Sequence, residues 1–252
     1  MKNINKILII FIILLISLCF RKTRKYIFSN YITITKEIPN KCWLHRTNTV
    51  EKMLEISEKY KGIEIDVNFN NDKLYFDVTH DLDKSIELSL EEYFKYFSKN
   101  DKKIWIDFKN LTERNVENSL NVFENLLRKY NVDRKRFIIE SNNFEVLQFY
   151  KEKGYYTSYY VPYLDLENMT SEELEEWRLK IKNITLTNNV SAISFPGHMY
   201  SFIKSIDVDI DLLTWEAGEK WQMLYYRKIT REMLKDEELK VILVKEYGKY
   251  HR

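Results

Sequence analysis

The chain has 252 residues, of which 44% are hydrophobic and 15% aromatic, so it is long enough for one large domain with a sizeable core. A formal net charge of +2 is too small to indicate a nucleic-acid partner, and we expect none. Only five glycines and three prolines occur, and these low counts argue against a Gly-rich phosphate-binding loop and a Pro-rich linker. We also find no dinucleotide fingerprint.

The N-terminus carries the apolar segment of residues 7–20, which basic residues flank on both sides. Such a segment is typical of a signal or a membrane anchor. Because no small-x-small cleavage motif follows, we interpret residues 1–25 as an uncleaved single-pass membrane anchor and residues 26–40 as a connector to a domain of residues 41–252. The positive charge after the apolar run favours a cytoplasmic domain. The basic start of a short N-terminal apolar run favours export, so we expect an extracytoplasmic domain.

Short apolar runs alternate with amphipathic segments throughout residues 41–252. The predicted strands are Cys42–Arg46, Gly62–Phe69, Lys103–Lys109, Arg136–Ser141, Tyr155–Val161, Ala192–Phe195, Asp209–Trp215 and Val241–Lys245. The predicted helices are Thr49–Tyr60, Glu113–Tyr130, Asn143–Lys153, Ser171–Ile181 and Glu219–Lys235. This α/β alternation predicts parallel pairing, and eight such strands predict a (β/α)8 TIM barrel. An open doubly wound sheet is the alternative.

The second predicted strand shows a strict alternation between apolar residues and two carboxylates, Glu64 and Asp66. Two carboxylates on one buried strand face repel each other and are costly to desolvate. The simplest stabilising partner is a divalent cation with oxygen ligands. A turn at residues 70–72 leads into a second apolar strand, Leu74–Val78, which ends just before His80. We therefore expect a hairpin extension on the second strand that carries a titratable imidazole.

In a barrel of this kind the functional site lies at the C-terminal ends of the strands. Polar side chains fall at that end of several predicted strands: His45 and Arg46 on the first, Glu64 and Asp66 on the second, His80 after the hairpin, and Asp107 and Lys109 on the third. Carboxylates that suit a metal, together with imidazoles and cations, predict a site for phosphoester hydrolysis.

The pattern resembles the glycerophosphodiester phosphodiesterase family and, more widely, the phosphatidylinositol-phospholipase-C-like barrels. The resemblance rests on His45-Arg46, Glu64-Ile-Asp66, His80-Asp81 and Asp107-x-Lys109, in that order along the chain, and it covers about residues 42–110. Further along the chain, Thr214-Trp215 on the seventh strand also matches. The resemblance implies a metal-dependent phosphoric diester hydrolase that acts on a phosphodiester small molecule or a lipid headgroup.

The resemblance also implies a role for each matching residue. Glu64, Asp66 and Asp107 would hold one divalent cation, Mg2+ or Ca2+; His45 and His80 would be the general acid–base pair; Arg46, Lys109 and Trp215 would bind substrate. Three points stay open: which histidine is the acid, whether water or a neighbouring hydroxyl of the substrate attacks the phosphate, and which two alcohols the substrate contains.

Two departures from the family pattern keep other functions open. Thr47 stands where the family usually has glycine, and Asp107 stands where it usually has glutamate. The alternative is a non-catalytic barrel that serves as a binding or scaffold domain at the membrane, with Glu64 and Asp66 paired to Arg46 and Lys109 in an ionic layer. A glycosidase with a carboxylate pair is a third possibility, but such a site needs no paired histidines.

Overall fold

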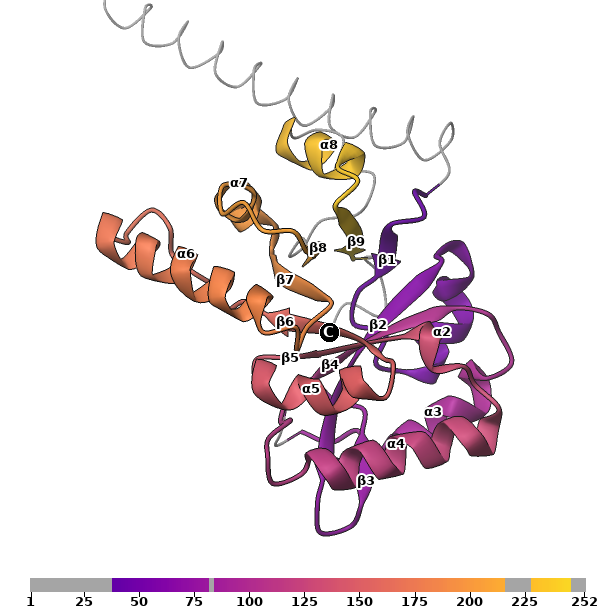
Figure 1. Cartoon of the computed structure of the whole chain (residues 1–252). Coiled ribbons are helices and arrows are strands. Elements are labelled where there is room, and N and C mark those ends of the chain that lie inside the picture. The colour runs from indigo at the N-terminus through magenta and orange to yellow at the C-terminus, as the bar shows by residue number, and fades with distance from the viewer. Residues whose placement is uncertain (1–37, 82–83, 216–227, 246–252) are drawn as a thin grey trace, which may run out of the picture.

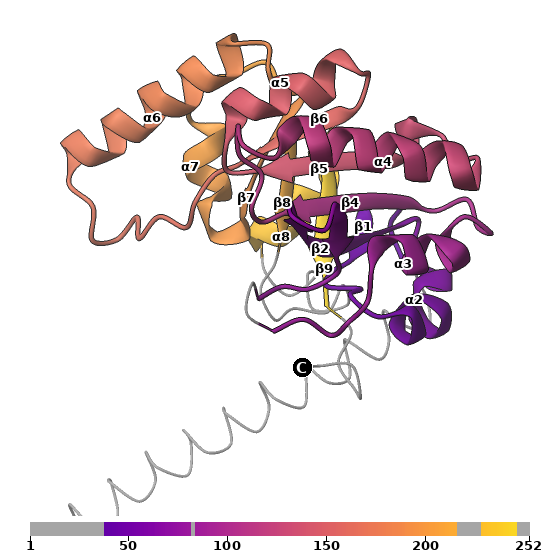
Figure 2. The same cartoon turned by 90° about the horizontal axis from the view of Figure 1, so that it is seen from below.

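The computed structural model describes residues 38–81, 84–215 and 228–245. These residues form one sheet that closes into a barrel, with helices packed on its outside (Figures 1 and 2). The predicted anchor of residues 1–25, including the run of residues 7–20, and most of the predicted connector of residues 26–40 lie outside the described residues. The division of the chain into these three segments therefore stays a prediction.

Eight of the described strands run parallel around the barrel. They are β1 (Cys42–Leu44), β2 (Gly62–Asn70), β4 (Lys103–Phe108), β5 (Phe137–Ser141), β6 (Tyr156–Tyr160), β7 (Ala192–Pro196), β8 (Asp211–Trp215) and β9 (Leu239–Val244). Strand β1 pairs with β9 on one side and with β2 on the other, which closes the ring. The predicted TIM barrel is confirmed, and the open doubly wound sheet is excluded because such a sheet leaves two free edges.

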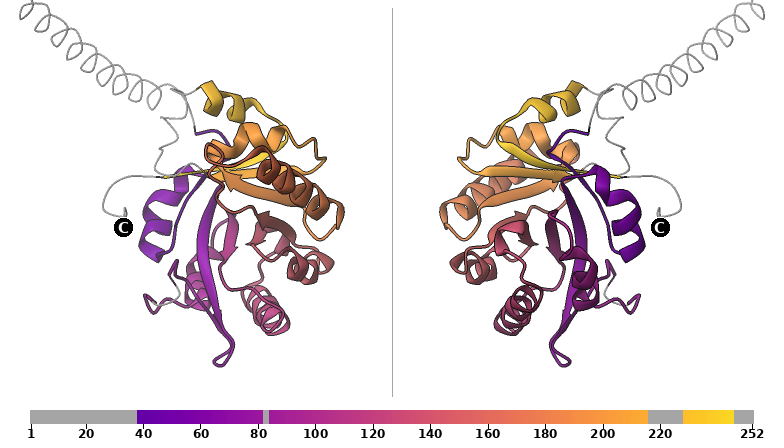
Figure 3. Two further views of the ribbon diagram at one scale, coloured as in Figure 1. Left: turned by 90° about the vertical axis from the view of Figure 1, so that its left-hand side faces the viewer. Right: turned by 90° about the vertical axis from the view of Figure 1, so that its right-hand side faces the viewer.

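The predicted hairpin extension is present as β3 (Tyr75–Asp77), which pairs antiparallel with the outer half of β2. Strand β2 is nine residues long, and Figure 3 shows that its hairpin with β3 extends beyond the other strands. The return of the chain from this hairpin brings His80 back toward the barrel mouth.

The described helices cover the outer face of the barrel (Figure 2). They are α2 (Val50–Ile56), α3 (Leu90–Phe97), α4 (Val116–Tyr130), α5 (Phe144–Glu152), α6 (Ser171–Leu186), α7 (Tyr200–Lys204) and α8 (Lys228–Lys235), with short 3-10 turns at Ser57–Lys59, Arg134–Arg136 and Gly197–Met199. Helix α6 begins with a capping box, in which Thr170 and Glu173 satisfy each other's backbone N–H groups. The predicted start of this helix, Ser171, agrees with the structure. Helices α3 and α7 were not predicted.

The core has two parts because strand side chains alternate between the helices and the barrel interior. Apolar residues of β2 such as Ile63 and Ile65 face the helices. The interior is filled by Trp43, Trp105, Ile138, Ala192, Leu213, Val241 and Leu243. Gly62 has no side chain there because a Cβ atom would overlap the indole ring of Trp43. This apolar plug forms the floor beneath the polar mouth, so the site above it is shielded from one side.

The predicted single-pass membrane localisation is corrected by the structure. Over residues 38–81, 84–215 and 228–245, no helix combines the length and apolarity needed to cross a membrane. The apolar run on which the prediction rested lies outside these residues, and the membrane-anchored localisation is not supported.

Candidate functional site

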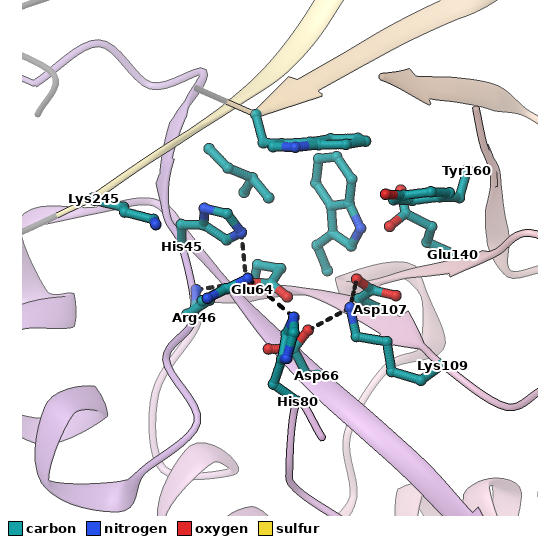
Figure 4. A pocket seen from close by; sticks show the side chains of 13 residues that line it. His45, Arg46, Glu64, Asp66, His80, Asp107, Lys109, Glu140, Tyr160 and Lys245 are labelled. Atoms are coloured by element: carbon teal, nitrogen blue, oxygen red, sulfur yellow. Dashed lines mark hydrogen bonds and ion pairs between the residues drawn. The ribbon is translucent and has the colours of Figure 1, made fainter. Parts of the chain in front are cut away.

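A pocket of about 140 Å3 opens at the C-terminal ends of the barrel strands. It is lined by His45, Arg46, Glu64, Asp66, His80, Trp105, Asp107, Lys109, Glu140, Tyr160, Trp215, Leu243 and Lys245 (Figure 4). All eight residues that the sequence singled out lie in this one lining. They come together because each follows or ends a parallel strand, and the ends of parallel strands share one mouth.

The three predicted metal ligands lie on two adjacent strands, β2 and β4. Asp66 and Asp107 are direct partners in the parallel register, and Glu64 precedes Asp66 by two residues on the same face. One oxygen from each of the three carboxylates lies within 4.8 Å of the others. Glu64 and Asp66 are 1% exposed, so their charges have little access to water. Such a cluster of buried oxygens needs positive charge close by.

Lys109 supplies part of that charge. Its Nζ lies 2.8 Å from Oδ1 of Asp66 and also contacts Oδ2 of Asp107. Burial raises the pKa of Asp107, and burial together with the two aspartates raises the pKa of Glu64. Burial also opposes ionisation of Asp66, but Lys109 and Asn48 outweigh it and hold the pKa of that carboxyl below its usual value.

The donor set fits a divalent cation. One lysine leaves two negative charges unmatched among the three carboxylates, of which Glu64 and Asp66 are buried and Asp107 is half-buried, and Mg2+ and Ca2+ prefer oxygen ligands of this kind. The raised pKa of Glu64 has burial as its main cause, and the negative charges of Asp66 and Asp107 add to it, so positive charge beside these carboxylates favours the ionised form. The predicted pairing of Arg46 with Glu64 is made by the backbone, since the Arg46 N–H donates to Oε2 of Glu64 at 2.5 Å.

The two histidines occupy different environments. His45 is largely buried, and its Nε2 lies 3.7 Å from Oε2 of Glu64. Its Nδ1 is buried without a hydrogen-bond partner among the described residues. Burial is the main cause that lowers the pKa of His45 to about 3, so the ring is neutral at physiological pH.

His80 is the more exposed histidine, with 43% of its side chain accessible. Its Nδ1 lies 2.7 Å from Oδ1 of Asp81, and its Nε2 lies 3.0 Å from the Arg46 guanidinium. A guanidinium only donates, so Nε2 accepts and Nδ1 donates its proton to Asp81. Asp81 therefore fixes the tautomer, and the Nε2 lone pair faces the pocket region where Arg46 lies.

The loop that carries His45 and Arg46 is held from three sides by residues that the sequence did not assign to the site. The Lys52 ammonium donates to the backbone carbonyls of His45 and Arg46, at 2.8 and 2.7 Å. Asn48 forms two hydrogen bonds with Asp66, one to its carboxylate and one from its backbone N–H. The Tyr93 hydroxyl donates to the carbonyl of Thr47 at 2.9 Å.

This support has a physical reason. Arg46 adopts a φ of 51°, in the left-handed region that L side chains rarely occupy. Strained backbone of this kind persists only when its surroundings hold it. The Thr49 hydroxyl, directly before α2, accepts from the N–H of Lys52 and so caps that helix beside the loop.

The far side of the pocket carries aromatic and acidic groups. The rings of Tyr160 and Trp215 stack at 5.1 Å between centroids and 14° between planes. Glu140, at the end of β5, accepts a hydrogen bond from the Ser194 hydroxyl. Burial and the neighbouring Asp107 raise the pKa of Glu140. Sequence reasoning did not find Tyr160 or Lys245. The only signal for these two pocket residues was that each is a polar residue at the end of a strand.

Comparisons with known proteins give the fold. No family model and no curated protein matches the sequence. A solved glycerophosphodiester phosphodiesterase from Parabacteroides distasonis superposes with a TM-score of 0.57 at 15% identity, over 83% of this chain and 94% of that one. An Oleispira antarctica phosphodiesterase in complex with the product sn-glycerol-3-phosphate gives 0.52 at 13% identity, over 81% and 92%.

A third barrel shows how far this likeness extends. The N-(5'-phosphoribosyl)anthranilate isomerase from Pyrococcus furiosus superposes with a TM-score of 0.51 at 12% identity, over 83% of this chain and 90% of that one. Because an enzyme of different chemistry scores almost as well, the likeness concerns the barrel. The resemblance predicted from the sequence is thus confirmed for the fold: the chain has the closed parallel barrel found in glycerophosphodiester phosphodiesterases.

Proposed function

We propose that the chain is a phosphoric diester hydrolase that depends on a divalent metal, as its resemblance to glycerophosphodiester phosphodiesterases implies. One observation carries the proposal: three carboxylates, two histidines, an arginine and a lysine line a single pocket of about 140 Å3. The metal would be held by Glu64, Asp66 and Asp107. It would supply Lewis-acid stabilisation of the negative charge on phosphate oxygens.

In this proposal the chain's own cations bind the phosphate. The Arg46 guanidinium, which lies against His80 in the free protein, turns to a non-bridging phosphate oxygen. Lys109 holds Asp66 and Asp107 in place while it adds positive charge beside the phosphate. The stacked Tyr160–Trp215 pair provides a flat surface for the alcohol part of the substrate.

The environments of the histidines support a division of roles. His45 is neutral because of its burial, so it suits the base that takes a proton from the attacking hydroxyl or water. His80 reaches solvent and has Asp81 to stabilise its imidazolium form, so it suits the acid that protonates the leaving alkoxide. The phosphorus–oxygen bond to that alkoxide breaks as the new one forms.

A second candidate function is a non-catalytic barrel that binds a ligand. The observation in its favour is the Lys109 bridge, because an ammonium between Asp66 and Asp107 already forms part of an internal ionic layer. In that case the carboxylates need no metal, and the pocket residues serve stability or binding alone.

Two measurements on the full chain distinguish the hydrolase from the non-catalytic barrel: its metal content and its turnover of bis(p-nitrophenyl) phosphate. We expect one bound divalent ion, turnover that a chelator abolishes, and loss of about 10²-fold or more in kcat for His45→Ala, His80→Ala and Glu64→Gln. Each variant must keep the thermal unfolding transition of a folded barrel. A wild-type protein that binds no metal and turns over no diester would favour the non-catalytic barrel.

A further inference from the structure

Lys245 is a pocket residue to which the proposed function gives no role. It follows β9 directly, just as His45 follows β1, and these two strands are paired through Leu44 and Val244. The His45 backbone N–H donates to the carbonyl of Val244 at 2.9 Å, which fixes Lys245 beside the histidine. Figure 4 shows Lys245 on the His45 side of the pocket, away from Asp107.

Within the part of the chain that the structure describes, the Lys245 ammonium forms no hydrogen bond and no ion pair. The lysine is nevertheless partly buried, and burial followed by repulsion from Arg46 lowers its pKa, against the weaker attraction of the Glu64 carboxylate. The Arg46 guanidinium likewise has no carboxylate partner among these residues, since its contact is with Nε2 of His80. A partly desolvated cation without an ion-pair partner costs free energy, and an anionic ligand offsets that cost.

The charges of the pocket are therefore unevenly divided. On the β2 and β4 side, three carboxylates are balanced by Lys109 and the divalent cation of the proposed function. Glu140 is buried, and its burial together with the neighbouring Asp107 raises the pKa of its carboxyl, which disfavours a further negative charge there. On the β1 and β9 side stand two cations, Arg46 and Lys245, that form no ion pair with any of the residues that the structure describes. A phosphodiester carries one negative charge, which pairs with Arg46 and leaves Lys245 unmatched.

We propose that the substrate is a phosphodiester with a second anionic group, a carboxylate or a phosphate, on one of its alcohols, and that Lys245 pairs with this group. The inference rests on the proposed function for its scissile phosphate, and it adds a substrate class. Lys245 lies beside His45 rather than among the carboxylates, so the second anion belongs within a few bonds of the scissile phosphate.

Two glycerophosphodiesters that differ by one carboxylate provide the test: sn-glycero-3-phospho-L-serine and sn-glycero-3-phosphoethanolamine. We expect kcat/KM of the full chain with bound metal to be about tenfold higher or more for the serine diester, the size of a hydrogen bond to a charged group. In Lys245→Gln the ratio falls toward one, and in Lys245→Arg it is kept. Glycerophosphoglycerol with and without a terminal phosphate repeats the comparison with a phosphate, in place of the carboxylate, as the second anionic group.

Lys240→Gln is the matched control, because Lys240 lies on the same strand at the opposite end and pairs with Asp211. It should keep the wild-type ratio. Turnover of the ethanolamine diester with no preference for either anionic diester would overturn the inference and leave the proposed function intact.

Binding measured by calorimetry separates the two proposals if neither diester is turned over. O-phospho-L-serine and phosphoethanolamine differ by the same carboxylate. A preference for phosphoserine in wild type that disappears in Lys245→Gln would support the anion site without catalysis. Equal binding of the two phosphates in both proteins would overturn it.

Discussion

At the scale of single residues, Asp81 decides what His80 can do. It accepts the Nδ1 proton of His80 at 2.7 Å, and its other oxygen lies 3.0 Å from the Lys84 ammonium. Asp81, four residues after the end of β3, is thus a positioning residue. Its exposed location on the loop means that removing it does not disturb the core.

We predict that Asp81→Ala lowers kcat by about 10-fold to 100-fold, the range found when the hydrogen-bond partner of a functional histidine is lost. The physical reason is that the imidazole then loses both its fixed tautomer and the charge that stabilises its imidazolium form. Steady-state kinetics across pH check it. The control Lys84→Ala keeps the Asp81–His80 bond and should stay near wild type; equal losses in both variants would contradict the assignment.

His45 makes a prediction about stability and pH. Burial lowers the pKa of His45 from 6.5 to about 3. Between these two pH values the unfolded chain binds a proton at His45 that the folded protein does not bind. Stability from this residue is therefore complete above pH 6.5 and is lost as pH falls toward 3. Between pH 7.5 and pH 5 the loss amounts to about 2 kcal/mol.

Urea unfolding of metal-free wild type and His45→Gln at those two pH values checks this prediction. The variant lacks the titrating ring, so its free energy of unfolding should fall by about 2 kcal/mol less than that of the wild type on acidification. Parallel pH curves for the two proteins would show that His45 titrates normally and is not shielded from water.

At the scale of elements, the start of β2 depends on the packing of one glycine against one indole. Gly62 faces the barrel interior, and Trp43 of the neighbouring β1 covers it. We predict that Gly62→Ala destabilises the protein by about 1–3 kcal/mol, the usual cost of overpacking a core. Thermal or urea unfolding measures it.

A double variant tests the cause of that loss. Trp43→Leu frees the space above residue 62, so adding Gly62→Ala to it should cost much less than in the wild-type background. If Gly62→Ala costs the same free energy in both backgrounds, the effect comes from backbone entropy rather than from the indole.

The elements also show what the sequence could predict. All eight barrel strands were found within a few residues, because alternation and flanking polar residues are local signals. The short helices α3 and α7 were missed, since a helix of five to eight residues barely completes two turns of periodicity. The site residues were predictable where they end a strand. Lys52 and Tyr93 were not, because their contacts with the His45 loop form only in the folded barrel.

At the scale of the whole molecule, closure of the barrel was predictable from the number of strands, whereas the predicted membrane localisation finds no support among the described residues. The count works because parallel strands alternating with helices have few ways to bury both faces. Closure also brings β1 and β9 together, and with them His45 and Lys245, which lie 200 residues apart in numbering. No local pattern in the sequence reveals that pairing.

The same closure makes the stability of the barrel depend on the charges at its mouth, and Lys109 is the internal counter-charge there. We predict that Lys109→Met lowers the free energy of unfolding of the metal-free protein by about 3–5 kcal/mol, because it leaves Asp66 and Asp107 buried without a cation. A divalent ion at about 1,000 times its dissociation constant returns about 4 kcal/mol. The melting temperature of the variant should therefore rise more steeply with added metal than that of a control, Lys204→Met, whose partner Asp236 lies outside the pocket. Two outcomes would contradict this prediction: Lys109→Met is as stable as the wild type without metal, or added metal shifts neither melting temperature. In either case Lys109 and a metal do not both bind the three carboxylates, and another group balances their charge.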